Sequence, residues 1–262
     1  MIEDIIKIED VILIAKNAGG IIMRYYGNSP KVTIKKDSTP VTQADFAADK
    51  YIRSELERLF PRHKILSEET ESNLTDFSGY VWMVDPLDGT STFALNRKEF
   101  SSIIGLCKDG IPILGVVYAP AMGKLWYAEK GKGAFMDDGS GIKRLKVSTK
   151  DNFSDSKAII KPGLTKLDNL PIYNFKQESG AAIKIMQIAN GEVELHIDGT
   201  YKASKWDVCG TSMILTEAGG RLTDLSGRPI DYFSRSSKLK DSFMVSNSLI
   251  HDEAVREIRK YL

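Results

Sequence analysis

The sequence has little cysteine, little histidine and no long apolar run. Its two cysteines, Cys107 and Cys209, both lie in apolar stretches, so a disulfide framework is not expected and a reducing compartment is favoured. No apolar run approaches the roughly 20 residues that span a bilayer, and the acidic start of the chain lacks the basic region of a signal peptide. The three histidines lie outside any motif, and we interpret them as structural or surface residues. We therefore expect a cytoplasmic protein.

The chain also lacks a strong net charge of either sign. Lysine and arginine number 36 against 35 aspartate and glutamate, a formal net charge of +1. The chain therefore has no overall electrostatic field that would attract a nucleic-acid polymer or an anionic membrane. The basic runs at 146–150 and 235–240 are interpreted as solvated loops. A chain of 262 residues that is 42% hydrophobic and 27% charged has the composition of an ordinary globular protein.

Periodic patterns predict the order of helices and strands. Apolar residues near a helical period predict a helix over 5–26 and a second over 42–60 with Thr42 as its N-cap. The first helix fits core packing and peripheral association with an inner membrane equally well. Short strand-like runs between 64 and 136, separated by turn signals, predict a largely antiparallel sheet. Later strands are predicted at 156–160, 192–197, 221–224 and 242–246, and later helices at 181–189, 207–218 and 252–262.

This order predicts layered α and β elements in a single domain, residues 1–262. Within it we expect an N-terminal α+β lobe over about 1–145 and a C-terminal α/β lobe over about 146–262. The sequence shows no internal repeat, low-complexity tract or long linker.

The strongest chemical signal is a heptapeptide, VDPLDGT, that begins at Val84. A strand-like run leads directly into two acids, Asp85 and Asp88, with a proline between them. Gly89 allows a sharp turn and the close approach of a phosphate, and a helix starting at Thr90 would direct free amides at an anion. Mg²⁺ prefers hard oxygen ligands and usually retains waters and substrate phosphate. Taken alone, the heptapeptide also fits a solvated turn.

Three further acids accompany the heptapeptide. Glu68 follows a short strand, Asp207 opens a predicted helix directly after Trp206, and Asp45 lies in the first turn of the second helix. Taken singly, Glu68 fits a surface acid, Asp207 a helix cap and Asp45 a first-turn helix acid. These acids therefore indicate a metal site only in combination with Asp85 and Asp88.

In order and spacing, this combination resembles the inositol monophosphatase superfamily over nearly the whole chain. The matching segments are DPLDGT at 85–90, Glu68-Glu69, and Trp206-Asp207 followed by EAGG at 217–220. The resemblance implies an α/β (α+β) fold, the layered α-β-α-β-α sandwich of the inositol monophosphatase and fructose-1,6-bisphosphatase type. It also implies a lithium-sensitive, Mg²⁺-dependent phosphatase that uses two to three metal ions. A homodimer is a further expectation from the resemblance.

The resemblance assigns roles to individual residues. The implied metal ligands are Glu68, Asp85, the Leu87 carbonyl, Asp88 and Asp207. Glu68 and Thr90 are expected to orient and deprotonate the attacking water, and Asp45 to hydrogen-bond Thr90. The implied contacts of the substrate are Leu87, Asp88, Gly89, Thr90, Ser91 and Asp207.

Within the superfamily, the chain is most similar to the 3′(2′),5′-bisphosphate nucleotidase branch, the CysQ type. Leu87 in the heptapeptide, the stretch 115–120 and the KWDVC run at 205–209 carry this similarity. It implies conversion of adenosine 3′,5′-bisphosphate (PAP) to AMP and phosphate, a reaction of sulfur metabolism. The chain departs from many sequences of this branch after Thr90, where Ser91 replaces a lysine.

Lysines bear on the choice of substrate. Inositol-specific members carry a glutamate about six positions before the Trp-Asp pair, and this chain has Thr200 there. Lys202 and Lys205 lie beside it, and Lys184 lies in the preceding predicted helix. A lysine suits a second phosphate as a point charge, and each of these lysines also fits an ordinary solvated surface.

Two alternatives to the nucleotidase remain. The metal site is indifferent to the leaving group, so inositol 1-phosphate or a sugar bisphosphate such as fructose 1,6-bisphosphate is an alternative substrate. The alternative from another class is a non-catalytic regulator that binds metal or nucleotide. The intact set of acids argues against it, because a degenerated enzyme is expected to have lost at least one of them.

Overall fold

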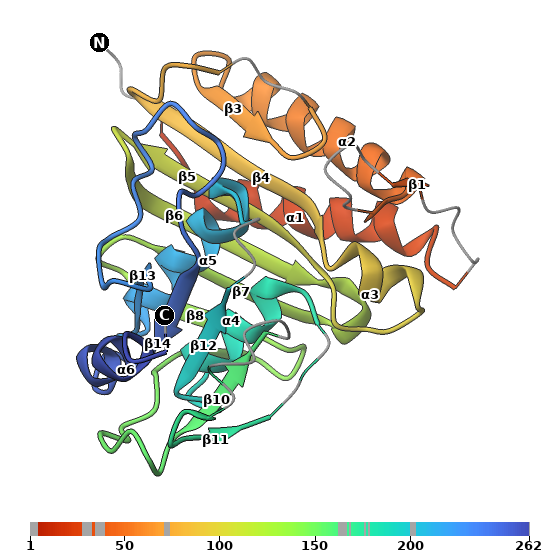
Figure 1. Cartoon of the computed structure of the whole chain (residues 1–262). Helices are drawn as coiled ribbons and strands as arrows, with labels where there is room; N and C mark the ends of the chain where they lie inside the picture. The colour runs from red at the N-terminus through yellow and green to blue at the C-terminus, as the bar shows by residue number, and fades with distance from the viewer. Residues whose placement is uncertain are drawn as a thin grey trace.

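The fold is described from a computed structural model of the chain (Figure 1), which covers residues 5–27, 33–34, 40–70, 74–161, 167, 169–175, 177, 179–199 and 203–261. Two residues considered above as substrate determinants, Thr200 and Lys202, lie outside the described residues. Among the described residues, no helix combines the length and the apolar character needed to cross a bilayer.

A seven-stranded sheet fills the N-terminal half, in the order β3-β4-β5-β6-β7-β8-β9. Its strands are β3 (Lys64–Ser67), β4 (Tyr80–Asp88), β5 (Ser101–Lys108), β6 (Ile111–Ala119), β7 (Lys124–Glu129), β8 (Gly133–Asp137) and β9 (Ile142–Arg144). β3 and β4 run parallel, and every other neighbouring pair is antiparallel. The predicted antiparallel character is confirmed, whereas β9 was not predicted because its exposed residues carry no apolar pattern.

Side chains alternate across this sheet, so that both faces are buried. On β4, Trp82 and Val84 pack toward one helical layer, and Val81 and Met83 toward another. The first layer consists of α1 (Ile8–Met23) and α2 (Gln43–Leu59), and the second of α4 (Ala181–Ala189) and α5 (Lys205–Glu217). Thr42 forms a capping box with Asp45 at the start of α2, which confirms the predicted N-cap.

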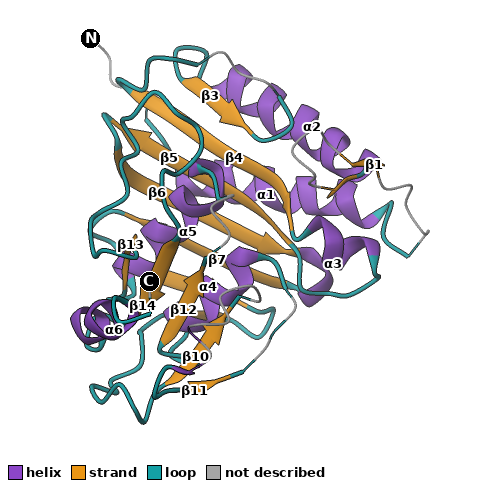
Figure 2. Cartoon of the chain, in the orientation of Figure 1, coloured by secondary structure: helices purple, strands orange, loops and turns teal. Residues whose placement is uncertain are grey.

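A second, five-stranded sheet lies beyond α4 and α5, in the order β11-β10-β12-β14-β13. Its strands are β10 (Lys157–Ile160), β11 (Tyr173–Asn174), β12 (Leu195–Asp198), β13 (Arg221–Asp224) and β14 (Phe243–Ser246). Helix α6 (His251–Ile258) covers its outer face. The result is the expected α-β-α-β-α layering (Figure 2). The remaining short elements are β1 (Thr33–Ile34), β2 (Pro40–Val41), α3 (Thr90–Ala94) and the 3₁₀ turn η1 (Pro120–Met122).

Glycines bring α5 unusually close to the large sheet. A Cβ on Gly115 of β6 would overlap the carbonyl of Gly210 in α5, and one on Gly105 of β5 would come within 2.7 Å of Cys209 Sγ. The backbones therefore meet where any side chain would separate them. This contact fixes α5, and with it the residues of its first turn, relative to β4 and β5.

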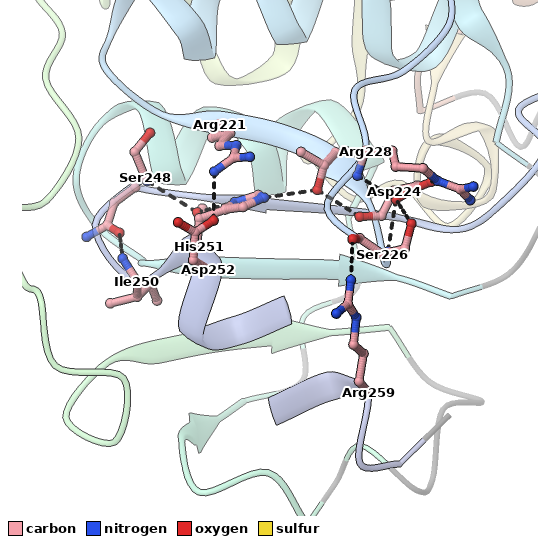
Figure 3. Close-up of polar contacts among 12 residues, drawn as sticks. Arg221, Asp224, Ser226, Arg228, Ser248, Ile250, His251, Asp252 and Arg259 are labelled. Atoms are coloured by element: carbon pink, nitrogen blue, oxygen red, sulfur yellow. Dashed lines mark hydrogen bonds and ion pairs between the residues drawn. The ribbon is translucent and has the colours of Figure 1, made fainter. Parts of the chain in front are cut away.

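The histidines and cysteines have structural environments. His251 is hydrogen-bonded to Thr223 Oγ1 at 2.9 Å and to Ser246 Oγ at 2.8 Å. It lies beside the turn at Asp224 and the ion pair between Arg221 and Asp252 (Figure 3). Because it is fully buried, its pKa falls to about 4. The cysteine thiols are both free and buried, as predicted.

Candidate metal centre and active site

The end of β4 carries the heptapeptide, and its backbone departs from regular pairing there. Asp85 pairs with Ile103 of β5, but Asp88 pairs with Ser101, so the register shifts between the two acids. Pro86 lies at this break and has no amide hydrogen, so the broken pairing costs it no hydrogen bond to β5. The Leu87 amide instead leaves the sheet and donates to Asp85 Oδ1 at 3.0 Å. The two acids therefore lie where the regular pairing of β4 with β5 breaks.

Three acids from separate segments meet at this point. Ligand oxygens of Glu68, Asp85 and Asp207 all lie within 4.8 Å of one another. Glu68 comes from the turn after β3, Asp85 from β4 and Asp207 from the first turn of α5. The Ser204 amide donates to Asp207 Oδ2 at 2.6 Å, which fixes the carboxylate at the start of α5. The sequence-predicted acids are thus brought together by elements far apart in the chain.

Asp88 lies beside this group and also contacts α4. It accepts hydrogen bonds from the amides of Ala181 and Ala182, at 3.0 and 2.9 Å. These amides belong to the first turn of α4 and have no partner within the helix. A carboxylate oxygen that accepts one hydrogen bond retains a second lone pair for a metal ion. Asp88 can therefore serve both as the cap of α4 and as a metal ligand.

Thr90 is held from two sides. Its hydroxyl lies 3.0 Å from Asp45 Oδ1 and 3.1 Å from the Leu87 carbonyl oxygen. The other oxygen of Asp45 accepts from both the amide and the hydroxyl of Thr42, at 2.8 and 2.6 Å. The expected hydrogen bond between Asp45 and Thr90 is therefore present. The α2 cap fixes the carboxylate that in turn orients the threonine.

The phosphate-binding residues expected after Asp88 lie at the start of α3. Gly89 is its N-cap in the left-handed conformation, with φ 85°, which a glycine adopts at little cost. Thr90 begins the helix and Ser91 is exposed on it. The first amides of a helix have no intrahelical partners, so this turn offers donors directly after Asp88 in the chain.

The acidic centre is electrostatically unfavourable when its carboxylates are all ionised. Burial raises the pKa of Asp85 well above its ordinary value, and the negative charges of Glu68, Asp88 and Asp207 raise it further. Burial, followed by the charge of Glu68, likewise raises the pKa of Asp207. All the donors are hard oxygens, the ligand type that Mg²⁺ prefers. The donor set therefore fits a divalent cation that would neutralise the group.

The two lysines proposed for a second phosphate have different environments. Lys184 lies one turn into α4 and is 5% exposed. Burial, and then the nearby Lys161, lower its pKa, while the charges of Asp88 and Asp198 oppose this shift. Within the described ranges, the Lys184 ammonium makes no hydrogen bond or ion pair. It is therefore available to an anion that enters beside Asp88.

The ammonium of Lys205 contacts interior groups, so the structure gives no support to the predicted contact between Lys205 and substrate. Its ammonium donates to the carbonyl of Tyr232 at 2.9 Å and to that of Ser234, and it lies 3.6 Å from the ring centroid of Phe77. The side chain is fully buried, and burial lowers its pKa to about 8. The fold uses the four-carbon stem of Lys205 to bring a cation to interior carbonyls.

Two residues near the centre were not predicted from the sequence. Asp49, one helical turn after Asp45, contacts the segment around Glu68. Gly180 packs against the carboxylate of Asp88, so that a Cβ there would overlap Asp88 Oδ2 and come within 2.8 Å of its Cγ. The four-residue spacing of Asp45 and Asp49 was a signal for the first. No local signal identified the second.

We expect Mg²⁺ to stabilise the protein, and to do so more strongly at higher pH. The raised pKa of Asp85 means that the metal-free folded state keeps a proton which the unfolded chain, with a value of 3.8, has released. The stability that this proton confers is complete below about pH 4 and is lost as pH rises through the raised pKa. A metal ion that pairs with ionised carboxylates removes that loss.

The measurement is thermal unfolding with Mg²⁺ or with a chelator. At a concentration of about 100 times Kd, Mg²⁺ is expected to raise Tm by roughly 5–10 °C. The gap between the two conditions should widen from about pH 5 to about pH 8. Equal Tm values with Mg²⁺ and with chelator at about pH 8 would contradict a metal site in this acidic group.

Comparisons with known proteins agree with this geometry. A family model described as the inositol monophosphatase family matches residues 4–261. The 3′(2′),5′-bisphosphate nucleotidase CysQ of Aggregatibacter actinomycetemcomitans is 32% identical over 250 residues, 91% of each chain. The histidinol-phosphatase of Mycobacterium tuberculosis is 33% identical over 238 residues, 87% of this chain and 88% of its own. Among solved structures, the IMPase of Thermotoga maritima matches with a TM-score of 0.83 and 28% identity, and the match covers 97% of each chain.

Proposed function

Since the chain belongs to the inositol monophosphatase family, we propose that it is a Mg²⁺-dependent phosphomonoesterase that acts on a 3′(2′),5′-bisphosphate nucleotide such as PAP. Membership of this family, together with similarity to named phosphatases, identifies the chain as a phosphatase-type hydrolase. Two supports are independent of these names: the Glu68–Asp85–Asp207 group, and the buried ammonium of Lys184, which makes no hydrogen bond or ion pair among the described residues.

The proposed metal site uses side chains from two layers of the fold, the large sheet and the α4/α5 layer. Glu68, Asp85 and Asp207 would hold the ions, with Asp88 and the Leu87 carbonyl as further ligands. Bound Mg²⁺ would supply Lewis-acid stabilisation of the phosphoryl oxygens and a water of lowered pKa. Two Mg²⁺ ions match the four carboxylates in charge, because each ion neutralises two of them, and the negative charge of the substrate phosphate would balance a third. We propose this stoichiometry from the acid count and the family resemblance.

The protein groups around the metals would carry the proton transfer. Glu68 would accept a proton from the attacking water, while Thr90, held by Asp45, would orient that water. The water oxygen forms a bond to phosphorus as the P–O ester bond opposite it breaks, and the departing alkoxide takes up a proton. The amides of Gly89, Thr90 and Ser91 would stabilise the phosphoryl oxygens. No covalent phosphoenzyme is needed.

The preference for a substrate with two phosphates rests on Lys184. Lys184 is 5% exposed, and its ammonium interacts with the charges of Asp88 and Asp198 but makes no hydrogen bond or ion pair within the described structure. A second phosphate would supply such a bond. Lys184 lies beside Asp88 rather than in the Glu68 group, so the cation is next to the metal centre but separate from it. This placement suits a phosphate that is bound and not cleaved.

A substrate with a single phosphate is the second candidate. Its support is the similarity to the histidinol-phosphatase and to the IMPase structure. The experiment that decides is phosphate release with Mg²⁺ from PAP, inositol 1-phosphate, fructose 1,6-bisphosphate and histidinol phosphate, measured in parallel. The highest kcat/KM for PAP is expected. A clear preference for another member of the panel would overturn the nucleotidase proposal, and Mg²⁺ binding without any turnover would favour a binding protein.

Replacing Lys184 by methionine tests the second-phosphate role. A charge-assisted hydrogen bond to phosphate contributes roughly 1.5–3 kcal/mol, so KM for PAP is expected to rise about 10- to 100-fold. KM for a substrate with one phosphate should change less than about 3-fold. The matched control is Lys50→Met, because Lys50 is an exposed lysine on α2. An equal rise of KM for both substrates in Lys184→Met would contradict the role.

A further inference from the structure

Helix α2 carries two buried acids on one side, and they contact different parts of the centre. Asp45 and Asp49 are four residues apart, so their side chains lie one above the other. Asp45 holds Thr90 after β4. Asp49 is 3% exposed and accepts hydrogen bonds from Ser67 Oγ, from Thr70 Oγ1 at 3.0 Å and from Arg53 Nε at 2.8 Å. The first two of these donors belong to the segment that begins at the end of β3.

Ser67 and Thr70 lie on either side of Glu68 in the sequence. Ser67 is the last residue of β3, and the Glu68 amide donates to the Val84 carbonyl at 3.1 Å. The turn is therefore attached to β4 through its backbone, one residue before Asp85. Asp49 attaches the same turn to α2 through two side-chain hydroxyls. Between these two attachments, the Glu68 carboxylate extends to the group formed with Asp85 and Asp207.

We propose that Asp49 is a positioning residue for the metal centre, acting through Ser67 and Thr70 to hold the Glu68 turn in its ligating arrangement. This inference rests on the proposed metal-dependent function. Asp49 is not a member of the acidic group itself, and its carboxylate oxygens are engaged by Ser67, Thr70 and Arg53. Loss of its two hydroxyl contacts would free the turn to move relative to α2, while the attachment of Glu68 to β4 remains.

The inference assigns different functions to the two acids of α2. Asp45 orients a residue that contacts the water and the phosphate, whereas Asp49 orients a residue that binds metal. Variants of Asp49 should therefore alter the Mg²⁺ dependence and kcat, and leave KM for the substrate unchanged. A residue that only stabilises the fold would lower Tm without changing the Mg²⁺ concentration needed for half-maximal activity.

The test is a double-mutant cycle of Asp49→Ala and Glu68→Gln, with Mg²⁺ binding measured by the metal-induced rise of Tm as well as by activity. Asp49→Ala, which removes both acceptor oxygens, is expected to raise the half-saturating Mg²⁺ concentration about 10-fold and to lower kcat about 10-fold. In the Glu68→Gln background it should change Mg²⁺ binding little, because the ligand that it positions is already lost. Arg53→Met is the matched control, because it removes the half-buried partner of Asp49 and leaves both hydroxyl contacts.

Equal losses of Mg²⁺ affinity in the wild-type and Glu68→Gln backgrounds would overturn the inference, as would a lower Tm with unchanged Mg²⁺ dependence. Thr70→Ala provides a milder variant if Asp49→Ala does not fold. It removes one hydroxyl contact and should give a smaller shift in the same direction; an unchanged Mg²⁺ dependence would count against the inference. Wild-type activity and Mg²⁺ binding in Glu68→Gln alone would instead overturn the proposed metal assignment, and the positioning role with it.

Discussion

Asp85→Asn is expected to stabilise the metal-free protein and to inactivate the enzyme. Asp85 is 2% exposed, and its pKa is raised by burial and by neighbouring carboxylates. An amide in its place needs neither a bound proton nor a buried charge, and therefore removes this electrostatic cost at neutral pH. The introduced asparagine retains an oxygen that can accept the Leu87 amide, which preserves the bulge. The same change removes a central metal ligand.

Stability is expected to rise while activity falls, and this combination distinguishes a metal ligand from a residue that only supports the fold. The Tm of the metal-free protein should rise, by about 2–4 °C for each kcal/mol of electrostatic cost removed. kcat/KM should fall by roughly 10³-fold, the loss expected when several kcal/mol of metal-derived stabilisation disappear. The Mg²⁺-induced rise of Tm should shrink with it. A residue that served the fold alone would show a lower Tm and an activity loss no larger than that destabilisation explains.

Asp155→Asn is the matched control, because Asp155 is an exposed aspartate in a turn before β10. It should leave activity, Tm and Mg²⁺ dependence close to wild type. Activity within a few-fold of wild type in Asp85→Asn would contradict its place in the centre. A lower Tm of the metal-free variant would show that the Leu87 contact outweighs the electrostatic cost of the buried charge.

Local patterns predicted the elements that carry the site. The α4 helix was expected at 181–189 and is found with those bounds, because Gly180 and the Asn190-Gly191 pair flank a continuous apolar segment. The strand before Asp85 and the helix after Thr90 were also expected, because an apolar run, a proline and a glycine define them. The short strands β1, β2, β9 and β11 were missed because two or three residues carry no periodic pattern.

The acids that form the centre could be identified from the sequence, but their partners could not. The contact between Asp88 and α4 joins residues 93 positions apart, and nothing near either residue predicts it. Lys205 is the contrasting case. A lysine before the Trp-Asp pair was expected at the substrate, yet its stem runs inward and its ammonium bonds carbonyls of the segment 232–234. The direction of a long side chain depends on which segments pack around it, and the sequence does not specify them.

Gly180 packs against the Asp88 carboxylate, so a small substitution at Gly180 can test the position of Asp88. The Gly180 φ of −53° is accessible to any residue, so alanine would cause no backbone strain. The obstacle is the carboxylate of Asp88, with which a Cβ would overlap. That carboxylate is the movable end of a side chain, so the fold can accept Gly180→Ala if Asp88 moves. In moving, Asp88 would lose the amides of Ala181 and Ala182 and its position beside the other acids.

Gly180→Ala is therefore expected to lower kcat by about 100-fold or more and to raise the half-saturating Mg²⁺ concentration, while Tm falls by only a few degrees. The matched control is Gly20→Ala in α1, where a Cβ would meet nothing within 4 Å. There alanine should stabilise the helix by up to about 1 kcal/mol and leave activity unchanged. Because both changes add one methyl group, a loss confined to Gly180→Ala would assign the effect to Asp88. Wild-type kinetics in Gly180→Ala would mean that Asp88 can move without harm, and its role as a metal ligand would then be contradicted.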